Sequence, residues 1–419
     1  MTFNDALEYL KIASGRGSRL GLERISVLME KLGNPQNKVK IIHVTGTNGK
    51  GSFNAMLTSV LKSAGYRVGS FSSPAITEVT DSFRIDCEEI SKKDFAEIMD
   101  IVYPVCESMD DKPTEFEVLT AMAFELFLQK ECDIAVVECG MGGDLDSTNV
   151  IESPLLSVIT NVRKDHCSFL GNTIEEIAFH KSGIIKEKRP VFFGDEKIPD
   201  IIIETAKRKF AELFRIKPYS VEPVFSLPGT EFLYKDMKIT LPLLGTYQLN
   251  NVFNVLNCIE ILKNQGLCIS ENAITEGLKN TKWHGRFELL RNNPIVIFDG
   301  SHNPDGITRT AESLEKYFDS RVVMLIGVMA DKEYNLYADI LGKYIDCVFT
   351  VNPDNPRSLD SKILAETFLR KNITAKAFTV LSDGVESAYL YAKENNLPLI
   401  ALGSLYMYRE FTNALNNIS

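Results

Sequence analysis

The sequence has no apolar run long enough to cross a membrane. Its longest clean apolar stretch, residues 322–330, falls far short of the roughly 20 residues that a spanning helix needs. The N-terminus carries no positively charged segment followed by an apolar one, so we expect no secretory signal. The eight cysteines include no Cys-x-x-Cys pair, which argues against a zinc site and for reduced thiols. These absences predict a cytoplasmic protein with no membrane attachment.

The chain also has fewer basic than acidic residues. The 46 Lys and Arg residues are outnumbered by 56 Asp and Glu, which gives a net charge of −10. Such a chain repels polyanions, so we expect no nucleic-acid partner, although a local basic pocket for a small phosphate ligand is still allowed. Apolar residues make up 44% and charged residues 24%, which are ordinary globular values and exclude a disordered or coiled-coil chain.

A length of 419 residues is more than one hydrophobic core usually serves. Apolar runs without polar alternation, each followed by a turn signal and a helical pattern, predict parallel strands covered by helices, that is, an α/β fold. These runs lie at 40–44, 133–137, 156–160, 295–298, 321–326, 347–351 and 397–402. We predict a hairpin over 231–241, a helical stretch from 250 to about 278, and a domain break near 282–286. The predicted domains are 1–284 and 285–419.

The strongest local signal is IIHVTGTNGKGS at residues 41–52. An apolar strand ends in a glycine-rich turn, and a helix is expected to begin at about Ser52. Backbone N–H groups of such a turn and of the helix N-terminus can surround a phosphate, and Lys50 adds a positive charge. The spacing differs from both GxxxxGK[ST] and GxGxxG, so a tight strand-to-helix turn with a surface lysine stays open as an alternative.

Several further motifs, in the same order, resemble those of folylpolyglutamate synthases and dihydrofolate synthases, which belong to the Mur ligase superfamily. The resemblance spans roughly residues 20–335. Besides the glycine-rich loop it rests on GLERI at 21–25, SSP at 72–74, TEFE at 114–117, ECGMGGDLDSTN at 138–149, DH at 165–166, HKSGIIK at 180–186, GRFE at 285–288 and DGSHNP at 299–304. It implies a Mur-ligase-type P-loop ATP-binding domain with a mainly parallel sheet. A smaller Rossmann-like C-terminal domain, which would bind glutamate, is expected to follow.

The resemblance also implies a reaction. ATP would phosphorylate a folate carboxylate, and the amino group of L-glutamate would displace phosphate from the acyl phosphate, extending (tetrahydro)folate polyglutamates at the γ-carboxylate. Alternatives are dihydrofolate synthesis from dihydropteroate, both activities together, and a Mur-like ligase for another carboxylate. A P-loop NTPase and a ligand-binding paralogue without catalysis also stay open. The expected partners are ATP, folate and L-glutamate, and the expected state is a monomer.

The family's metal ligands match Ser73, Glu138 and His166. They would hold Mg²⁺, with two ions expected in all, and Mn²⁺ could substitute. Lys181 stands where the family has a carbamylated lysine, whose carbamate can ligate a metal as an ammonium cannot. Each of these residues alone could instead be a cap, a strand-end acid or a surface lysine.

The resemblance assigns the remaining site residues to ATP and to the substrate. Lys50, Lys181, His166 and Arg286 would be catalytic. The nucleotide-binding residues would be Thr47, Asn48, Gly49, Lys50, Gly51, Ser52, Gln248, Asn251, Arg286, Asp299 and His302. The pterin and aminobenzoate pocket would be lined by Thr114, Phe116 and Asp146, although core packing is an alternative for Phe116 and polar helix-face positions for the two amides.

Three positions depart from the family pattern. Asp81-Ser82-Phe83 stands where a Glu-Arg pair and an apolar residue are usual, so a charge that could hold the substrate or a mobile loop is missing unless Arg84 replaces it. Tyr247 replaces a histidine, and His284 replaces a proline. None of these changes removes a proposed metal or phosphate ligand.

Overall fold

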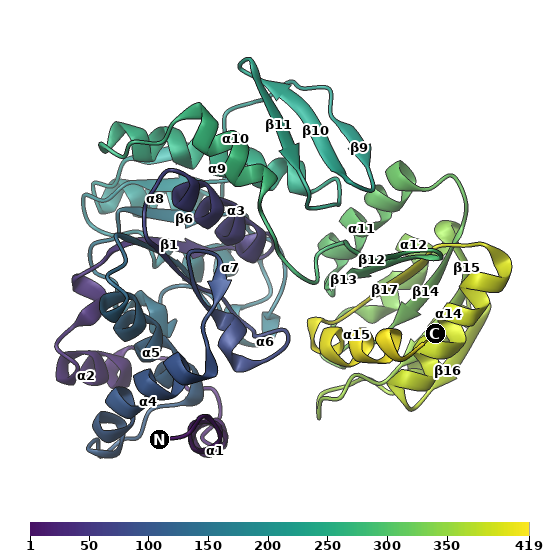
Figure 1. The fold of residues 1–419 in the computed structure, drawn as a ribbon, viewed down its shortest axis with the longest axis horizontal. Coiled ribbons are helices and arrows are strands. Elements are labelled where there is room, and N and C mark those ends of the chain that lie inside the picture. The colour runs from purple at the N-terminus through teal and green to yellow at the C-terminus, as the bar shows by residue number, and fades with distance from the viewer. Residues whose placement is uncertain (419) are drawn as a thin grey trace. The chain divides into compact units, whose positions relative to one another are not determined.

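The computed structural model describes residues 1–418, which form two compact units (Figure 1). The first unit comprises Met1–Ser220 and Asn250–Asn280, and the second comprises Val221–Leu249 and the chain from Thr281 onward. No helix within the described residues is long and apolar enough to span a bilayer.

An eight-stranded sheet forms the centre of the first unit, in the order β4-β3-β2-β5-β1-β6-β7-β8. Strands β1, β2, β5, β6, β7 and β8 pair in parallel, while β3 and β4 add an antiparallel edge. The strands are β1 (Lys40–Thr45), β2 (Val68–Phe71), β3 (Phe83–Ile85), β4 (Glu88–Glu89), β5 (Ile134–Glu138), β6 (Leu156–Ile159), β7 (Val191–Phe193) and β8 (Leu213–Arg215). Strands β2, β5, β6 and β7 are buried along their whole length, as expected for strands covered on both faces.

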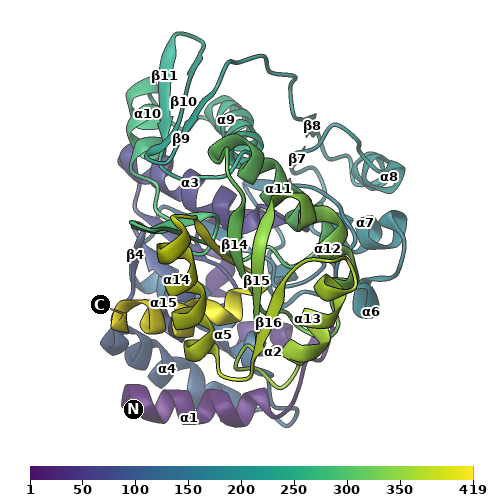
Figure 2. The same cartoon turned by 90° about the vertical axis from the view of Figure 1, so that its right-hand side faces the viewer.

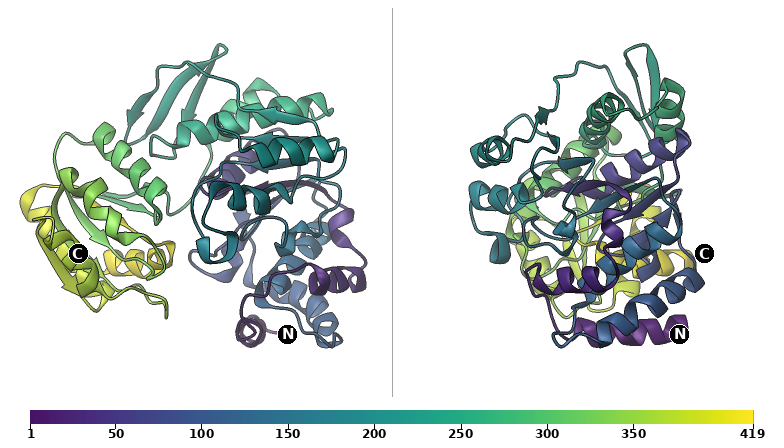
Figure 3. Two further views of the ribbon diagram at one scale, coloured as in Figure 1. Left: turned by 180° about the vertical axis from the view of Figure 1, so that it is seen from behind. Right: turned by 90° about the vertical axis from the view of Figure 1, so that its left-hand side faces the viewer.

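Ten helices accompany this sheet in the described part of the chain. They are α1 (Phe3–Ser14), α2 (Glu23–Lys31), α3 (Lys50–Ser63), α4 (Lys92–Glu107), α5 (Glu115–Gln129), α6 (Cys167–Leu170), α7 (Ile174–Ser182), α8 (Asp200–Arg208), α9 (Gln248–Asn264) and α10 (Glu271–Lys279). Helix α1 packs against α4 and α5 (Figure 3). The ring of Phe3 meets that of Phe95 edge to face at 5.5 Å. Helix α10 packs on α3 so closely that the Ser59 hydroxyl donates to the Gly277 carbonyl at 2.6 Å.

The second unit contains a six-stranded sheet in the order β12-β13-β17-β14-β15-β16, parallel except for β12 (Figure 2). Its strands are β12 (Glu288–Asn292), β13 (Ile295–Asp299), β14 (Val322–Ile326), β15 (Ile345–Val351), β16 (Ala375–Phe378) and β17 (Leu399–Leu402). Its helices are α11 (Pro304–Tyr317), α12 (Tyr337–Leu341), α13 (Ser361–Leu369), α14 (Leu381–Asn395) and α15 (Tyr408–Asn417). A separate antiparallel sheet is built from β9 (Val224–Ser226), β10 (Gly229–Tyr234) and β11 (Met237–Leu241).

The predicted α/β class is confirmed, and the apolar runs that were expected to be strands all contain one. The hairpin is also confirmed, because β10 pairs with β11 across Lys235 and Asp236. The helical stretch predicted from 250 to about 278 consists of two helices, α9 and α10. The chain leaves α9 through Gly266 in a left-handed conformation (φ +93°), and Ser270 caps a new helix, α10.

The compact units divide the chain differently from the predicted 1–284 and 285–419. The second unit resumes at Thr281, four residues before the predicted boundary, but it also includes Val221–Leu249. This segment is tied to α11, since the Thr246 N–H donates to the Ser313 hydroxyl at 3.0 Å.

Candidate active site

The glycine-rich loop joins β1 to α3, which begins at Lys50 rather than at Ser52. Gly46 has a φ of +154°, and a Cβ there would lie 1.8 Å from the Thr160 hydroxyl oxygen, so only glycine fits. Gly49 has a φ of +83°, and a Cβ there would lie 2.5 Å from Asn251 Oδ1. The tight backbone therefore depends on glycine for two reasons, its conformation and the close approach of neighbours.

An asparagine at the end of the neighbouring strand braces this loop. The Asn48 N–H donates to Asn161 Oδ1 at 3.0 Å, and Asn161 Nδ2 donates back to the Asn48 carbonyl at 2.9 Å. The Thr160 hydroxyl donates to the same carbonyl at 2.8 Å. Neither Asn161 nor Thr160 was predicted as a site residue, because a pairing across 113 residues becomes visible only when β1 and β6 lie side by side.

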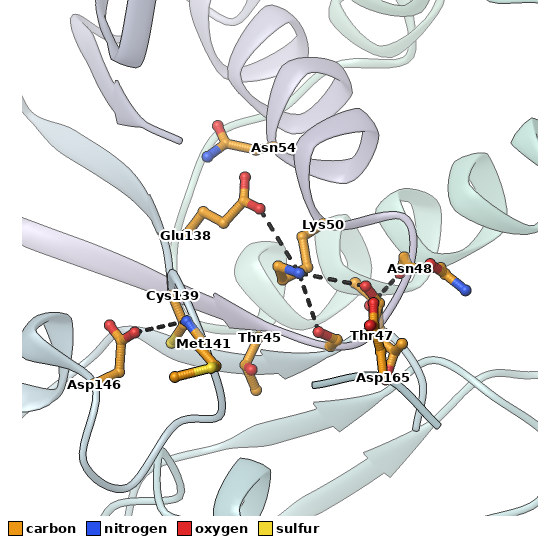
Figure 4. Close-up of polar contacts among 12 residues, drawn as sticks. Thr45, Thr47, Asn48, Lys50, Asn54, Glu138, Cys139, Met141, Asp146 and Asp165 are labelled. Carbon is orange, nitrogen blue, oxygen red and sulfur yellow. Dashed lines mark hydrogen bonds and ion pairs between the residues drawn. The ribbon is translucent and has the colours of Figure 1, made fainter. Parts of the chain in front are cut away.

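Two lysine ammonium groups converge on one backbone carbonyl of the loop. Lys50 Nζ donates to the carbonyls of Gly46 (3.1 Å) and Thr47 (3.3 Å), and it lies 3.9 Å from Glu138 Oε1 (Figure 4). Lys181 Nζ, from α7, donates to the same Gly46 carbonyl at 2.8 Å. Two positive charges gathered at a turn rich in N–H groups suit a polyphosphate.

Burial makes Lys181 a weak base. Its side chain is buried, and desolvation together with the nearby charge of Lys50 lowers its pKa to about 7. The lowered pKa favours the neutral amine, which is a nucleophile.

A cavity within the first unit connects the loop, the turn after β5 and the start of α6. Twelve residues line it: Thr45, Gly46, Thr47, Lys50, Cys139, Gly140, Met141, Gly142, Asp165, His166, Leu170 and Lys181. Parallel strands present their carboxyl ends here, which is where open α/β sheets bind ligands.

The proposed metal ligands occupy different settings. Glu138 ends β5, is 4% exposed and faces Lys50, whereas the His166 side chain is 46% exposed and lines the cavity at the start of α6. Ser73 follows β2 and is half-buried. Among residues 1–418 no three His, Cys, Asp or Glu side chains gather closely enough to hold a metal. A carboxylate, a hydroxyl and one imidazole fit an ion such as Mg²⁺ that keeps several waters.

The three residues predicted to line the substrate pocket have local partners. Thr114 is the N-cap of α5 and exchanges hydrogen bonds with Glu117. Phe116 packs against Gly140, where a Cβ would lie 2.7 Å from its ring. Asp146 caps the short helix at Ser147–Val150 and is 4% exposed. Phe116, through Gly140, and Asp146, which accepts the Met141 N–H at 2.8 Å, thus lie beside the cavity-lining turn at 139–142.

The other proposed nucleotide residues divide between the units. Asn251 belongs to the first unit and touches Gly49. In the second unit, Asp299 is fully buried and accepts from the Ser301 hydroxyl (3.0 Å), while His302 Nδ1 lies 2.9 Å from the Gly300 carbonyl oxygen.

The remaining two nucleotide candidates also belong to the second unit. Arg286 Nη1 donates to the Gly285 carbonyl at 3.2 Å, and Gln248, at the start of α9, is fully buried. Phe287, beside the arginine, is fully buried with a φ of +47°, a conformation that costs a bulky residue energy and persists only when its surroundings hold it.

The unusual residues at 81–83 have a structural role. The Asp81 carboxylate accepts the N–H groups of Ile76 (2.9 Å) and Thr77 (2.6 Å), so it orders the segment after Ser73. Arg84 donates to the Asp81 carbonyl, so its guanidinium supports the same segment. Tyr247 is half-buried and its hydroxyl donates to Asp299 at 3.5 Å, and His284 pairs with Glu288 at 2.7 Å.

Two family models match the chain. The Mur ligase middle domain matches residues 44–259, and the Mur ligase glutamate ligase domain matches residues 285–403. The fold is thus that of a Mur ligase.

Comparison with individual proteins shows which Mur ligases this chain resembles. The dihydrofolate synthase/folylpolyglutamate synthase of Bacillus subtilis is 33% identical over 99% of both chains, and the folylpolyglutamate synthase of Lacticaseibacillus casei is 34% identical over 92% of both. A solved bifunctional folylpolyglutamate synthase/dihydrofolate synthase with Mn, AMPPNP and L-glutamate bound has a TM-score of 0.84 and 27% identity, covering 99% of this chain and 98% of that one. The chain therefore belongs to the folylpolyglutamate synthase and dihydrofolate synthase family of Mur ligases.

Proposed function

We propose that this protein uses ATP to join L-glutamate to the γ-carboxylate of a reduced folate or its polyglutamates, releasing ADP and phosphate. The single observation that carries the proposal is the convergence of Lys50 and Lys181 on the Gly46 carbonyl, inside a phosphate loop of a folate-ligase family member. A related structure holds an ATP analogue, a divalent metal and L-glutamate together, which are the components that this reaction needs.

The loop residues would hold the ATP phosphates in line with the folate carboxylate. Phosphoryl transfer depends on positioning and charge stabilisation, so we assign this work to Lys50, to the loop N–H groups and to Arg286. The nucleotide would also contact Thr47, Ser52 and Asn251, and the carboxylate end of the folate would approach the cavity beside Met141.

Mg²⁺ would be held by Glu138, Ser73 and His166, and it would neutralise charge on the transferring phosphoryl group. We infer two ions, with Mn²⁺ as a substitute. Lys181 would carry a carbamate, supported by its burial, its lowered pKa and its position against the loop. A carbamate supplies anionic oxygens for a metal, and its formation requires the neutral amine.

The test is ATP-dependent incorporation of labelled glutamate by the purified protein with Mg²⁺. Tetrahydrofolate and dihydropteroate are assayed side by side, with a reaction lacking folate as the control. Incorporation with tetrahydrofolate alone supports the polyglutamate activity, and incorporation with both supports the bifunctional alternative, which the Bacillus relative's name favours. Equal ATP hydrolysis with and without any folate would contradict the proposal and favour an NTPase.

We also infer a monomer in the cytoplasm. All eight cysteines are free thiols, which suits a reducing compartment. Light scattering on the purified protein tests the monomer directly.

A further inference from the structure

The turn that carries Arg286 is held by hydrogen bonds to both backbone groups of the buried residue before it, Gly285. The Gly285 N–H donates to Glu288 Oε2 at 2.7 Å, and its carbonyl oxygen accepts the Gly300 N–H at 2.8 Å. Arg286 Nη1 donates to the same carbonyl oxygen at 3.2 Å. All four residues belong to the second unit. The backbone from which the guanidinium extends is therefore fixed through Gly285.

The guanidinium also packs on the turn that follows β13. A Cβ on Gly300 would lie 2.3 Å from Arg286 Nη1, so the arginine lies directly against the Gly300 backbone. Asp299, the last residue of β13, precedes this glycine and is fully buried. A shift of the Gly285 turn would therefore move the arginine relative to Asp299, another residue that we assign to the nucleotide.

A histidine backed by a tyrosine holds the Glu288 carboxylate. His284 Nδ1 lies 2.7 Å from Glu288 Oε1, and because a carboxylate accepts hydrogen bonds without donating them, Nδ1 carries the imidazole proton. The Tyr408 hydroxyl oxygen lies 3.2 Å from the same nitrogen. Tyr408 is 6% exposed, and its ring meets that of Phe298 edge to face at 5.1 Å, so the hydroxyl is anchored in the core. One carboxylate thus joins the His284 side chain to the Gly285 backbone.

His284 stands at a position where the family pattern has a proline. A proline ring restrains the backbone by fixing φ. His284 supplies a different restraint, a side-chain hydrogen bond to the carboxylate that also accepts the Gly285 N–H. The His284 side chain is 54% exposed, so its removal leaves no cavity in the core and its effect on the turn can be measured in a folded protein.

We propose that His284 and Glu288 are positioning residues that hold the Gly285 turn, so that the Arg286 guanidinium keeps its place for phosphoryl transfer. This inference rests on the proposed function, because the arginine acts on a phosphoryl group only if the protein is an ATP-dependent ligase. It extends that function by giving a departure from the family pattern a role in the rate of the reaction.

His284→Ala removes the imidazole donor. We expect kcat to fall about fivefold or more, while the Kd values for ADP and tetrahydrofolate stay within about twofold, because a displaced transition-state group lowers the rate without weakening ground-state binding. His284→Gln keeps a side-chain N–H that can reach the carboxylate and should recover part of the rate. Glu288→Ala removes the acceptor of both donors and should lower kcat more than His284→Ala.

A double-mutant cycle separates positioning from a general structural effect. In the Arg286→Ala background, His284→Ala should lower kcat no further, because the group that it positions is already absent. The matched control is Tyr344→Phe, which removes another 2.7 Å hydrogen bond to a carboxylate of the second unit, that of Glu315, and should keep the wild-type kcat.

The outcomes separate this inference from the proposed function. A wild-type enzyme that incorporates glutamate, with an unchanged kcat in His284→Ala, would overturn the positioning role alone. An equal fall in kcat in the wild-type and Arg286→Ala backgrounds would also overturn it, since the effect would not pass through the arginine. If Glu288→Ala does not fold, the two His284 variants carry the test. A wild-type protein that incorporates no glutamate would refute the proposed function and this inference with it.

Discussion

Lys50 is the side chain whose removal tests the phosphate loop most directly. Lys50→Ala deletes the ammonium that lies 3.1 Å from the Gly46 carbonyl oxygen, and we expect kcat to fall by about 100-fold or more, because charge stabilisation of the phosphoryl group is lost. Steady-state kinetics and circular dichroism give the rate and the fold. Lys62→Ala, at the exposed end of the same helix, should keep wild-type rates. A folded Lys50→Ala enzyme with full activity would remove the lysine from the mechanism.

The second prediction concerns Lys181 and the pH dependence of carbamate formation on its amine. Its pKa of about 7 lies below the usual 10.5, so the neutral amine becomes the major form as pH rises through 7. Carbamate labelling by ¹³C-bicarbonate, followed by NMR, should therefore increase between pH 6 and pH 8 and vanish in Lys181→Ala. That variant should lose about 100-fold in rate, as other lost transition-state electrostatics do. A rate change of only a few-fold, with no labelled signal in the wild type, would exclude a carbamate at this lysine.

Residues that act through neighbouring sequence were predictable, and residues that act through long-range packing were not. The spacing of Gly46, Gly49 and Lys50 along five residues predicted a phosphate loop. Asn161 could not be assigned to it, because its partner Asn48 is 113 residues away. The burial of Lys181 could not be predicted from the sequence either, so its lowered pKa follows only from the structure.

At the scale of the element, two glycines flank α3 in left-handed conformations, Gly49 before the helix and Gly65 after it. Their different surroundings predict different effects of substitution. Gly49 (φ +83°) faces Asn251, whereas Gly65 (φ +90°) has open space around its Cα. Each Gly→Ala change should cost about 1–2 kcal/mol for the conformation. Only Gly49→Ala forces the loop away from Asn251, so only it should also weaken ADP binding.

Chemical unfolding and calorimetric titration measure the two effects separately. Gly49→Ala should lose at least as much free energy of unfolding as Gly65→Ala, because only its Cβ also meets Asn251. Gly65→Ala should bind ADP like the wild type. Equal ADP affinities for both variants would show that the close contact at Gly49 does not shape the nucleotide site.

The lengths of the strands explain why some of them could be predicted from the sequence and others could not. Strands β1, β5 and β14 are five or six residues long and apolar, so their runs stand out. Strand β7 has three residues and β4 has two, too short for any periodicity to be visible. Their pairing is decided by neighbours in the sheet, which local sequence does not contain.

At the scale of the whole molecule, the residues assigned to one reaction belong to two compact units. Lys50, Glu138 and Lys181 lie in the first, and Arg286, Asp299 and His302 in the second. The order of motifs along the chain predicted both α/β parts. It did not predict that Val221–Leu249 would join the C-terminal unit, because the contact of Thr246 with Ser313 spans 67 residues.

Arg286 and Lys50 belong to different compact units, and the family resemblance gives both a role in phosphoryl transfer. If Arg286 acts on the transferring phosphoryl group, we expect it to matter in turnover and to add little to the binding of ADP, which lacks that group. Arg286→Ala should lower kcat by about 100-fold and change the Kd for ADP by less than about threefold. Arg286→Lys should recover only part of the rate, because a lysine lacks the planar fork that matches phosphate oxygens. Arg309→Ala, an exposed arginine of α11, is the matched control. A loss confined to ADP affinity would instead make Arg286 a binding residue and leave transition-state stabilisation to Lys50 and the loop.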